Sequence, residues 1–206
     1  DAERLSREAC DIYRQADDVQ GIATTMTVMA FQAQRRGRYE ESTTLFSETV
    51  ALWERLGDVT AVELATSNVA HSAKTAGHFE RARHLFEQLI ASSKDRGDIR
   101  AFTSALNGLG DVAAAEGSYD AARRYYQESL ARYREIDDRW GIARVLADLA
   151  NVDLHAGDYD VADRSLMEAL RACRALGHQR GVARQLEALS WSAGIQLRHE
   201  AAVRLA

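Results

Sequence analysis

The side chains of this sequence that could carry out acid–base or metal chemistry are six histidines, two cysteines and several pairs of adjacent acidic residues. A paired-acid site needs two carboxylates in one pocket with separated pKa values, and a zinc site needs cysteines and histidines at short, regular spacings. The acidic pairs are Asp17-Asp18, Glu40-Glu41 and Asp137-Asp138. No histidine has a cysteine at a metal-ligand spacing, and there is no HExxH motif. The residue types are present without the spacing that the chemistry requires.

Helix structure explains these residues better than catalysis does. Each acidic pair lies where a helix is expected to begin, and carboxylates there stabilise the positive end of the helix dipole. The hexad GLGDVA, starting at Gly108, partly matches a dinucleotide-binding motif but lacks the third glycine and the preceding strand. We therefore interpret Gly110 as a site of close helix packing. The sequence predicts no catalytic residue, no metal site, no cofactor and no enzymatic activity.

Composition and charge narrow the cellular setting. The net charge of −5 offers no basic surface for phosphates, so we expect no direct binding of nucleic acid. No stretch approaches about 18 consecutive apolar residues, so we expect no membrane association. Cys10 and Cys173 are isolated thiols, which predicts a reducing cytoplasm and no disulfide. Nearly all the positive charge is arginine, with Lys74 and Lys94 the two lysines, which favours a GC-rich bacterial source.

The elements that must position these side chains follow a 40-residue period. One set of turns places a glycine two residues before an aromatic: Gly37 and Tyr39, Gly77 and Phe79, Gly117 and Tyr119, Gly157 and Tyr159. A second set keeps the same interval: Asp17-Asp18, Gly57-Asp58, Gly97-Asp98, Asp137-Asp138 and Gly177-His178. Two turns per period, in a chain without proline, predict two uninterrupted helices per period.

The residues of the second turn set explain how one helix ends and the next begins. Gly57, Gly97 and Gly177 suit the left-handed residue after a helix, and Asp58, Asp98 and Asp138 suit the N-cap of the next. The second helix of each pair also has an apolar stripe, typified by Tyr159, Ala162, Leu166, Ala169, Leu170, Cys173 and Leu176. Small residues recur at Ala82, Ala122 and Ala162, and large ones at Phe46, Phe86, Tyr126 and Leu166. This alternation predicts interdigitating helical layers.

Residues 105–130, ALNGLGDVAAAEGSYDAARRYYQESL, resemble a tetratricopeptide repeat. The matching positions are Leu106, Leu109, Gly110, Gly117, Tyr119, Ala122, Tyr126 and Leu130. The period is longer than the family's commonest form, and Arg134 stands where a proline often closes the second helix. This longer form resembles the arrays of kinesin light chains, cell-polarity adaptors and large bacterial STAND and LuxR-type regulators of the maltose-activator kind. The resemblance implies an all-α fold, an alpha-alpha superhelix or solenoid of antiparallel helix pairs.

The register predicts a single array over residues 1–206. Residues 1–16 align with the second helix of a repeat, full repeats cover about 18–56, 58–96, 98–136 and 138–176, and 178–206 are a partial repeat, so we expect an excised fragment. Leu197 stands where the register expects glycine, and His199 where it expects the aromatic. We therefore expect the last turn to be distorted or its helix displaced.

By this resemblance, the first helices line a concave surface on which matched positions form ladders. The inward-facing candidates are Phe31, Arg35, Asn68, His71, Lys74, Asn107, Asp111, Arg144, Asp148, Asn151, His155, Arg184, Glu187 and Trp191. The asparagines among them could bind a peptide backbone, or they could be solvated. Arg144 and Arg184 share register and could hold a carboxylate or phosphate, or pair with Asp148 and Glu187. The two-lysine clamp of chaperone-binding members is missing.

These observations favour a protein- or peptide-binding module. The family resemblance places it in the sensor or interaction region of a larger bacterial signalling or transcription-regulating protein. Three alternatives stay open: a sensor domain for a small-molecule inducer, a free-standing adaptor or scaffold, and intramolecular docking against an ATPase module of the parent chain.

Overall fold

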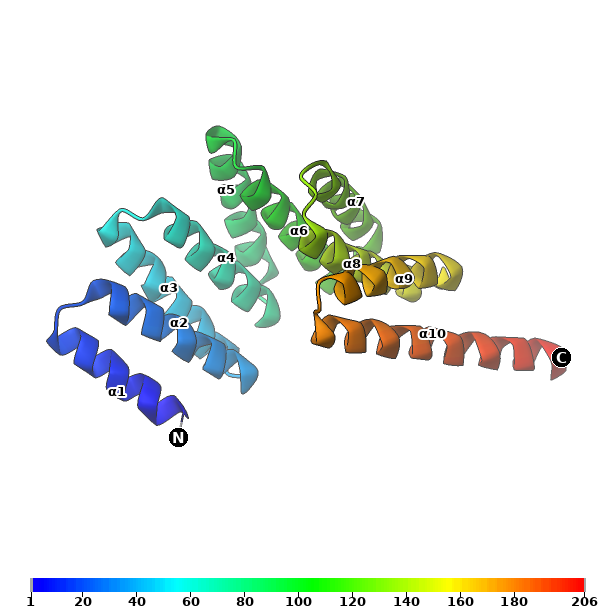
Figure 1. Cartoon of the computed structure of the whole chain (residues 1–206), viewed down its shortest axis with the longest axis horizontal. Coiled ribbons are helices and arrows are strands. Elements are labelled where there is room, and N and C mark those ends of the chain that lie inside the picture. The colour runs from blue at the N-terminus through cyan, green and yellow to red at the C-terminus, as the bar shows by residue number, and fades with distance from the viewer. Residues whose placement is uncertain (1, 206) are drawn as a thin grey trace. The chain divides into compact units, whose positions relative to one another are not determined.

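The computed structural model describes the backbone of residues 2–205 and the side chains of residues 2–197. Within these residues the chain forms ten α-helices and no strand (Figure 1). The helices are α1 (Ala2–Gln15), α2 (Val19–Arg35), α3 (Tyr39–Leu56), α4 (Val59–Thr75), α5 (Phe79–Arg96), α6 (Ile99–Ala115), α7 (Tyr119–Glu135), α8 (Arg139–Ala156), α9 (Tyr159–Ala175) and α10 (Gln179–Leu205). The all-α fold of paired helices that the sequence predicts is confirmed.

The chain divides into two compact units, unit 1 (Asp1–Gly97) and unit 2 (Asp98–Ala206). In unit 1, α1 packs on α2, α2 on α3, α3 on α4 and α4 on α5. In unit 2, helices α6 to α10 do the same, and α6 also contacts α8 directly. The first helices of the repeats in unit 2 therefore lie side by side, and we call the surface formed by α6, α8 and α10 the first-helix face.

The turns follow the predicted chemistry. Gly57, Gly97 and Gly177 all have positive φ. Asp17 and Asp137, which occupy the equivalent place where glycine is missing, adopt the same left-handed conformation with φ of 53° and 49°. The side chains of Asp18, Asp58, Asp98 and Asp138 each accept a hydrogen bond from the backbone N–H three residues on. Capping therefore accounts for two of the three acidic pairs, and Glu40 and Glu41 lie in the first turn of α3.

The alternation of small and large residues forms the core of both units. Ala82, Ala122 and Ala162 are fully buried, as are the large side chains at the next recurring position, Phe46, Phe86, Tyr126 and Leu166. Leu176 was expected in the buried stripe of the second helix, but it is 42% exposed. Leu176 is the C-cap residue of α9, and Leu56, at the same repeat position in α3, is also 45% exposed, so this position lies at the edge of the buried stripe.

Two further features concern the end of the chain and the surface. At residue 197, where the sequence predicts a distorted turn, α10 continues as an uninterrupted helix, because Leu197 is a good helix former without the conformational freedom of glycine. The side chain of His199 lies outside the described residues.

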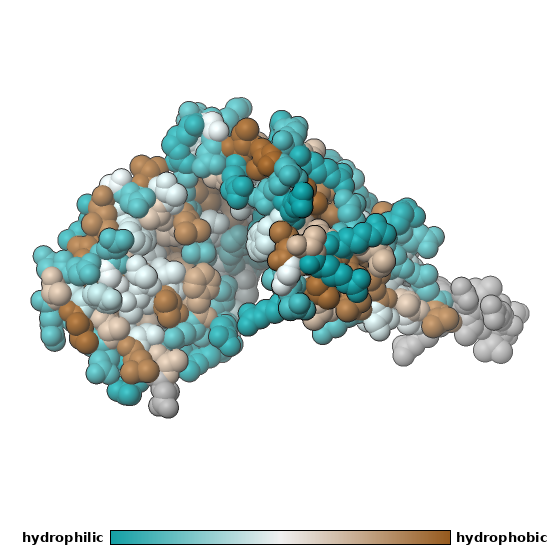
Figure 2. Space-filling view, viewed as in Figure 1, coloured by the Kyte–Doolittle hydropathy of each residue, from teal (hydrophilic) through white to brown (hydrophobic). Residues whose placement is uncertain are grey.

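The face drawn in Figure 2 shows hydrophilic residues interspersed with separate small patches of apolar residues.

Candidate functional site

Helices α6 and α8 bring four of the predicted ligand-binding residues onto one face of unit 2. Asn107 and Asp111 lie one turn apart on α6, and Arg144 and Asp148 lie one turn apart on α8. The amide Nδ2 of Asn107 donates a hydrogen bond to Oδ2 of Asp148 over 3.3 Å. Asn107 is only 1% exposed, so its amide is engaged inside the unit and holds the Asp148 carboxylate.

Tyr126 on α7 lies beneath this pair of helices. Its hydroxyl donates a hydrogen bond to Oδ1 of Asp111 over 2.9 Å. Burial raises the pKa of Tyr126 far above its ordinary value, and the negative charges of Asp111 and Asp148 raise it further, whereas the Arg144 charge lowers it. Tyr126 is therefore a neutral hydrogen-bond donor that orients the Asp111 carboxylate.

Arg144 is held between two aromatic rings. Its Nη2 donates to the hydroxyl of Tyr133 over 2.9 Å, and its guanidinium carbon lies 5.5 Å from the ring centroid of Trp140. Such cation–π contacts fix the plane of the guanidinium. The Nε atom of Arg144 is buried and has no hydrogen-bond partner. The side chain is thus positioned while one of its donors stays unused.

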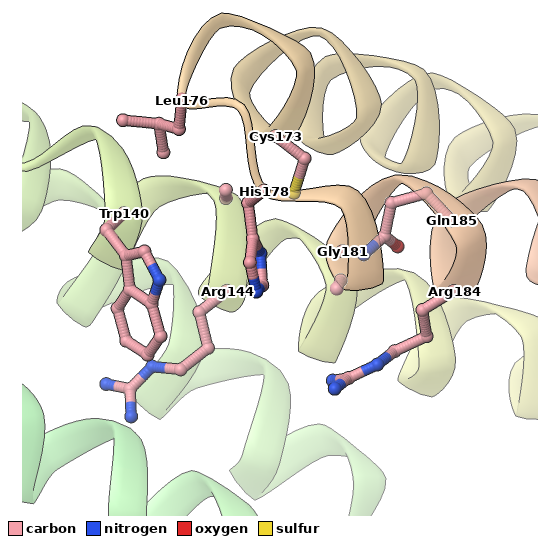
Figure 3. Close-up of a pocket in the computed structure, with 10 residues that line it drawn as sticks. Trp140, Arg144, Cys173, Leu176, His178, Gly181, Arg184 and Gln185 are labelled. Carbon is pink, nitrogen blue, oxygen red and sulfur yellow. The ribbon is translucent and has the colours of Figure 1, made fainter.

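A cavity of about 150 Å³ opens beside Arg144. Its walls come from α8, the end of α9 and the start of α10, all within unit 2 (Figure 3). The residues that line it are Trp140, Ala143, Arg144, Ala147, Cys173, Leu176, His178, Gly181, Arg184 and Gln185. Figure 3 shows the Arg144, His178 and Arg184 side chains arranged around the opening. No acidic residue lines the cavity, in a chain whose net charge is −5.

Two further residues of this cavity are buried, Gln185 and Cys173. Gln185 is 4% exposed and lines the cavity. Burial raises the pKa of the Cys173 thiol, while the positive charge of Arg184 lowers it. Arg184 itself forms no ion pair with Glu187 within the described part of α10.

The other predicted residues of unit 2 are mostly exposed on the first-helix face. Arg184, which lines the cavity, is exposed, and so are Asn151, Glu187 and Trp191, the last by 54%. The His155 ring stacks on Tyr119, with ring centroids 5.2 Å apart. Its Nδ1 also lies 2.7 Å from the backbone carbonyl oxygen of Asn151. His155 therefore packs at the turn between α8 and α9.

The predicted residues of unit 1 include two aromatic rings that pack on phenylalanines. Phe31 packs edge-on against Phe46 at a centroid distance of 5.0 Å and is still 45% exposed. His71 contacts Phe86 in the same way, also at 5.0 Å. Arg35 is exposed, whereas Asn68 and Lys74 are half-buried. The hydrogen-bonded network and the cavity described above belong to unit 2.

Sequence reasoning missed several residues of this network and cavity. Trp140, His178 and Gln185 were not expected to contribute, because the 40-residue ladders carry no matching aromatic or amide at these places. One signal was present: Trp140 lies four residues before Arg144, which places both on one face of a helix. Within the described residues no group of three or more His, Cys, Asp or Glu is placed to hold a metal ion. Nor does any helix in that part have the length and apolar character needed to cross a membrane.

Paired helices with a 40-residue period, capped by recurring glycines and aspartates, define the class of α-helical repeat proteins. The family model for tetratricopeptide repeats matches residues 21–95 and 102–175, which is more than half of the chain. The chain therefore belongs to the tetratricopeptide repeat family. Repeats of this family generally mediate interactions between proteins.

Solved structures agree with this assignment. BtubC from P. vanneervenii has a TM-score of 0.67 and 16% identity, over 94% of this chain and 90% of that one. A Rap protein complexed with Competence and Sporulation Factor scores 0.62 at 17% identity, over 95% of this chain and 59% of that one. A STAND protein with a tetratricopeptide repeat sensor from Pyrococcus horikoshii scores 0.70 at 16% identity, over 91% and 30%. No functionally curated protein matches. At these identities the similarity establishes the fold.

Proposed function

We propose that this chain is a protein- or peptide-binding module whose ligand lies on the first-helix face of unit 2. One observation carries the proposal: α6 and α8 contact each other and present polar side chains, some oriented by buried hydrogen bonds, beside a cavity that α8 and α10 line. Oriented polar groups next to an apolar hollow are what a specific binding site needs. Asp111 and Asp148 are candidate acceptors for backbone N–H groups, and exposed Asn151 is a candidate donor and acceptor.

The solved structures support a sensor or interaction role. The Rap protein is complexed with Competence and Sporulation Factor, and the Pyrococcus horikoshii protein is a STAND ATPase with a repeat sensor. This chain spans 59% and 30% of those two chains. We propose by analogy that it is the sensor region of a larger bacterial signalling or transcription-regulating protein in the cytoplasm. Docking against an ATPase module of the parent chain is a further role that the same face could serve.

A small-molecule inducer is the second candidate, and the cavity beside Arg144 favours it. A volume of about 150 Å³ accommodates a few non-hydrogen atoms of a ligand, although cavities for whole drug-sized ligands usually measure about 300 to 1,000 Å³. The cavity therefore fits one group of a ligand better than a complete metabolite. For this reason we place the peptide hypothesis first.

The test is a selection of random peptides displayed on phage against the complete 206-residue chain, followed by fluorescence anisotropy with a selected peptide. The double variant Asn151→Ala/Glu187→Gln removes two exposed polar groups of the first-helix face. We expect it to weaken binding about tenfold, or about 1.4 kcal/mol.

The matched control is Arg124→Gln/Glu128→Gln, which changes two exposed residues of α7 on the second-helix side. It should alter affinity less than twofold or so, since surface changes away from a contact cost little. The hypothesis fails if no peptide is enriched, or if the α7 variant weakens binding as much as the first-helix variant. In the first case, a thermal-shift screen of metabolites tests the inducer alternative.

A further inference from the structure

The cavity between α8, the end of α9 and the start of α10 combines positive charge with apolar walls. Arg144 and Arg184 are the charged residues that line it, and His178 lies between them in Figure 3. Ala143 and Ala147 contribute apolar surface along α8, and Leu176 does so at the end of α9. Because no carboxylate lines the walls, nothing in the lining neutralises the two guanidinium groups.

Hydrogen-bonding groups of two residues indicate the chemistry that this cavity could bind. The Nε of Arg144 is buried without a partner, and Gln185, which is 4% exposed, also lines the cavity. Arg144 offers an N–H donor, and the amide of Gln185 offers N–H donors and an oxygen. The first turn of α10 adds the positive end of a helix dipole next to Gly181. All of these features favour a negatively charged acceptor.

The apolar walls specify which anion fits. A bare phosphate would place nothing against Ala143, Ala147 and Leu176, whereas a carboxylate on a short hydrocarbon stem would fill that space and still reach the arginines. Guanidinium groups bind carboxylates through short, charge-assisted hydrogen bonds. We propose that this cavity is a binding site for a carboxylate carried on a short aliphatic stem, such as an acidic side chain of a bound partner or a small carboxylic acid.

Gly181, which has no Cβ atom, leaves His178 and Cys173 in their places at the wall of the carboxylate site. A Cβ atom at this position would lie 2.5 Å from Nδ1 of His178 and 2.6 Å from Sγ of Cys173. The glycine therefore lets α10 begin directly against the end of α9, with the side chains of His178 and Cys173 at the wall of the cavity. A larger residue there would displace both.

This carboxylate site rests on the proposed function, because a carboxylate subsite beside the first-helix face would select acidic partners. The carboxylate site and the peptide-binding function can still be tested separately. The experiment is a two-dimensional NMR titration of the complete chain that follows the Trp140 indole N–H and the Gln185 side-chain amide. The probes are N-acetyl-glutamate amide, its uncharged isostere N-acetyl-glutamine amide, and inorganic phosphate. We expect saturable shifts of both signals with the glutamate probe and much smaller shifts with the other two.

Variants of two arginines on α10 provide the matched comparison. Arg184→Gln should weaken binding of the glutamate probe at least tenfold, whereas Arg180→Gln, one turn away and outside the cavity, should change it less than twofold. The proposal is overturned if the glutamine isostere binds equally well, if phosphate binds better, if both variants weaken binding equally, or if no saturable shift occurs up to the solubility limit. Preserved amide spectra of both variants confirm that they are folded.

Two further probes separate the sources of the carboxylate. The pentapeptide Ac-Ala-Ala-Glu-Ala-Ala-amide is compared with butyrate, and tighter binding of the peptide identifies an acidic partner, whereas tighter binding of butyrate identifies a small acid. A phage-selected peptide that binds as well to Arg184→Gln as to the wild type would leave the proposed function standing and remove the carboxylate site. If the glutamate probe binds but no peptide is selected, the carboxylate site stands and the proposed peptide-binding function fails.

Discussion

Gly110 lets the tyrosine ring of α7 lie directly against the backbone of α6. A Cβ atom at this position would come within 2.5 Å of Cε1 and 2.7 Å of Cδ1 of Tyr126. The ring is buried and held by its hydrogen bond to Asp111, so it cannot move aside cheaply. The interpretation of Gly110 as a close-packing residue is confirmed. Gly110 also lies next to the hydrogen bond from Tyr126 to Asp111, which orients one carboxylate of the candidate site.

We predict that Gly110→Ala destabilises the protein by about 1 to 3 kcal/mol. Overpacking of a well-packed core costs about this much, and the better helix propensity of alanine offsets roughly 1 kcal/mol at most. The measurement is the free energy of unfolding in urea. Gly194→Ala is the control, because nothing lies within 4 Å of its Cβ position in α10, so it should be neutral or stabilising. Equal effects of the two substitutions would contradict the packing argument.

The pH dependence of stability should report on Tyr126. Because its folded-state pKa is raised above the ordinary value of 10.0, its contribution is complete below about pH 10 and is lost as pH rises further. Near about pH 11 this group alone contributes a slope of up to about 1.4 kcal/mol per pH unit. In Tyr126→Phe that slope should disappear, with a cost of about 1 kcal/mol at neutral pH from the lost hydrogen bond to Asp111.

Urea unfolding between about pH 8 and about pH 11 measures both effects. Tyr125→Phe is the matched control, since it removes a hydroxyl without a described hydrogen bond from the same helix. An unchanged slope in Tyr126→Phe would mean that the tyrosine can ionise without disrupting the fold.

At the scale of elements, the two kinds of helix start differently. The first helices α2, α4, α6 and α8 each begin with an aspartate whose side chain accepts a backbone hydrogen bond. The second helices α3, α5, α7 and α9 begin without any such side-chain bond. The first helices, which carry the candidate ligand-binding residues, therefore have the more strictly specified N-termini.

We predict that Asp58→Ala destabilises unit 1 by about 1 kcal/mol, the usual cost of removing an N-cap. The lost interaction is the 2.9 Å hydrogen bond from the backbone N–H of Ala61 to Oδ1 of Asp58. Asp58→Asn keeps the acceptor and should retain most of the stability. Thermal unfolding monitored by circular dichroism distinguishes the three proteins, and an asparagine variant as unstable as the alanine variant would show that charge, and not capping, matters.

At the scale of the whole molecule, each unit has its own internal packing. In unit 2, Ala122, Tyr126, Tyr133, Val145 and Leu149 belong to one buried cluster to which α7 and α8 contribute. Arg123 on α7 reaches Asp153 on α8 over 2.8 Å, and Asp153 is 5% exposed. In repeat proteins stability comes mainly from each repeat and its nearest neighbours.

We therefore predict that residues 98–206 produced alone fold into a helical, cooperatively unfolding protein. Far-ultraviolet circular dichroism should show high helix content, and the Trp140 indole signal should keep its dispersed NMR shift. Asp153→Ala is the test of specificity. It removes the 2.8 Å hydrogen bond from Arg123, whose side chain is 28% exposed and keeps its longer ion pairs with Asp120 and Asp158, so it should cost about 1.5 to 3 kcal/mol. A non-cooperative melt of residues 98–206 would show that unit 2 needs unit 1 to fold.

Residues with strong local preferences determined the fold by themselves. Glycine at the end of a helix, aspartate at the start of the next, and small and large apolar residues every 40 positions specify helix pairs without knowledge of the tertiary structure. One position differs from its pattern: Leu176 is exposed at the C-cap of α9. At Leu197, where the repeat pattern lacks its glycine, α10 continues because leucine favours a helix.

The candidate site depended on the tertiary structure. Repeat register placed Asn107 and Asp148 on first helices, but whether an amide faces solvent or donates to a neighbouring carboxylate depends on how closely α6 and α8 approach. The cavity joins Trp140 with residues of α10 that lie about 40 positions further along the chain. Local sequence determines where each helix begins and which face is apolar, because those preferences act over a few residues. Which side chains share a cavity is decided by packing between helices, because burial and hydrogen bonding there depend on distances that no local pattern encodes.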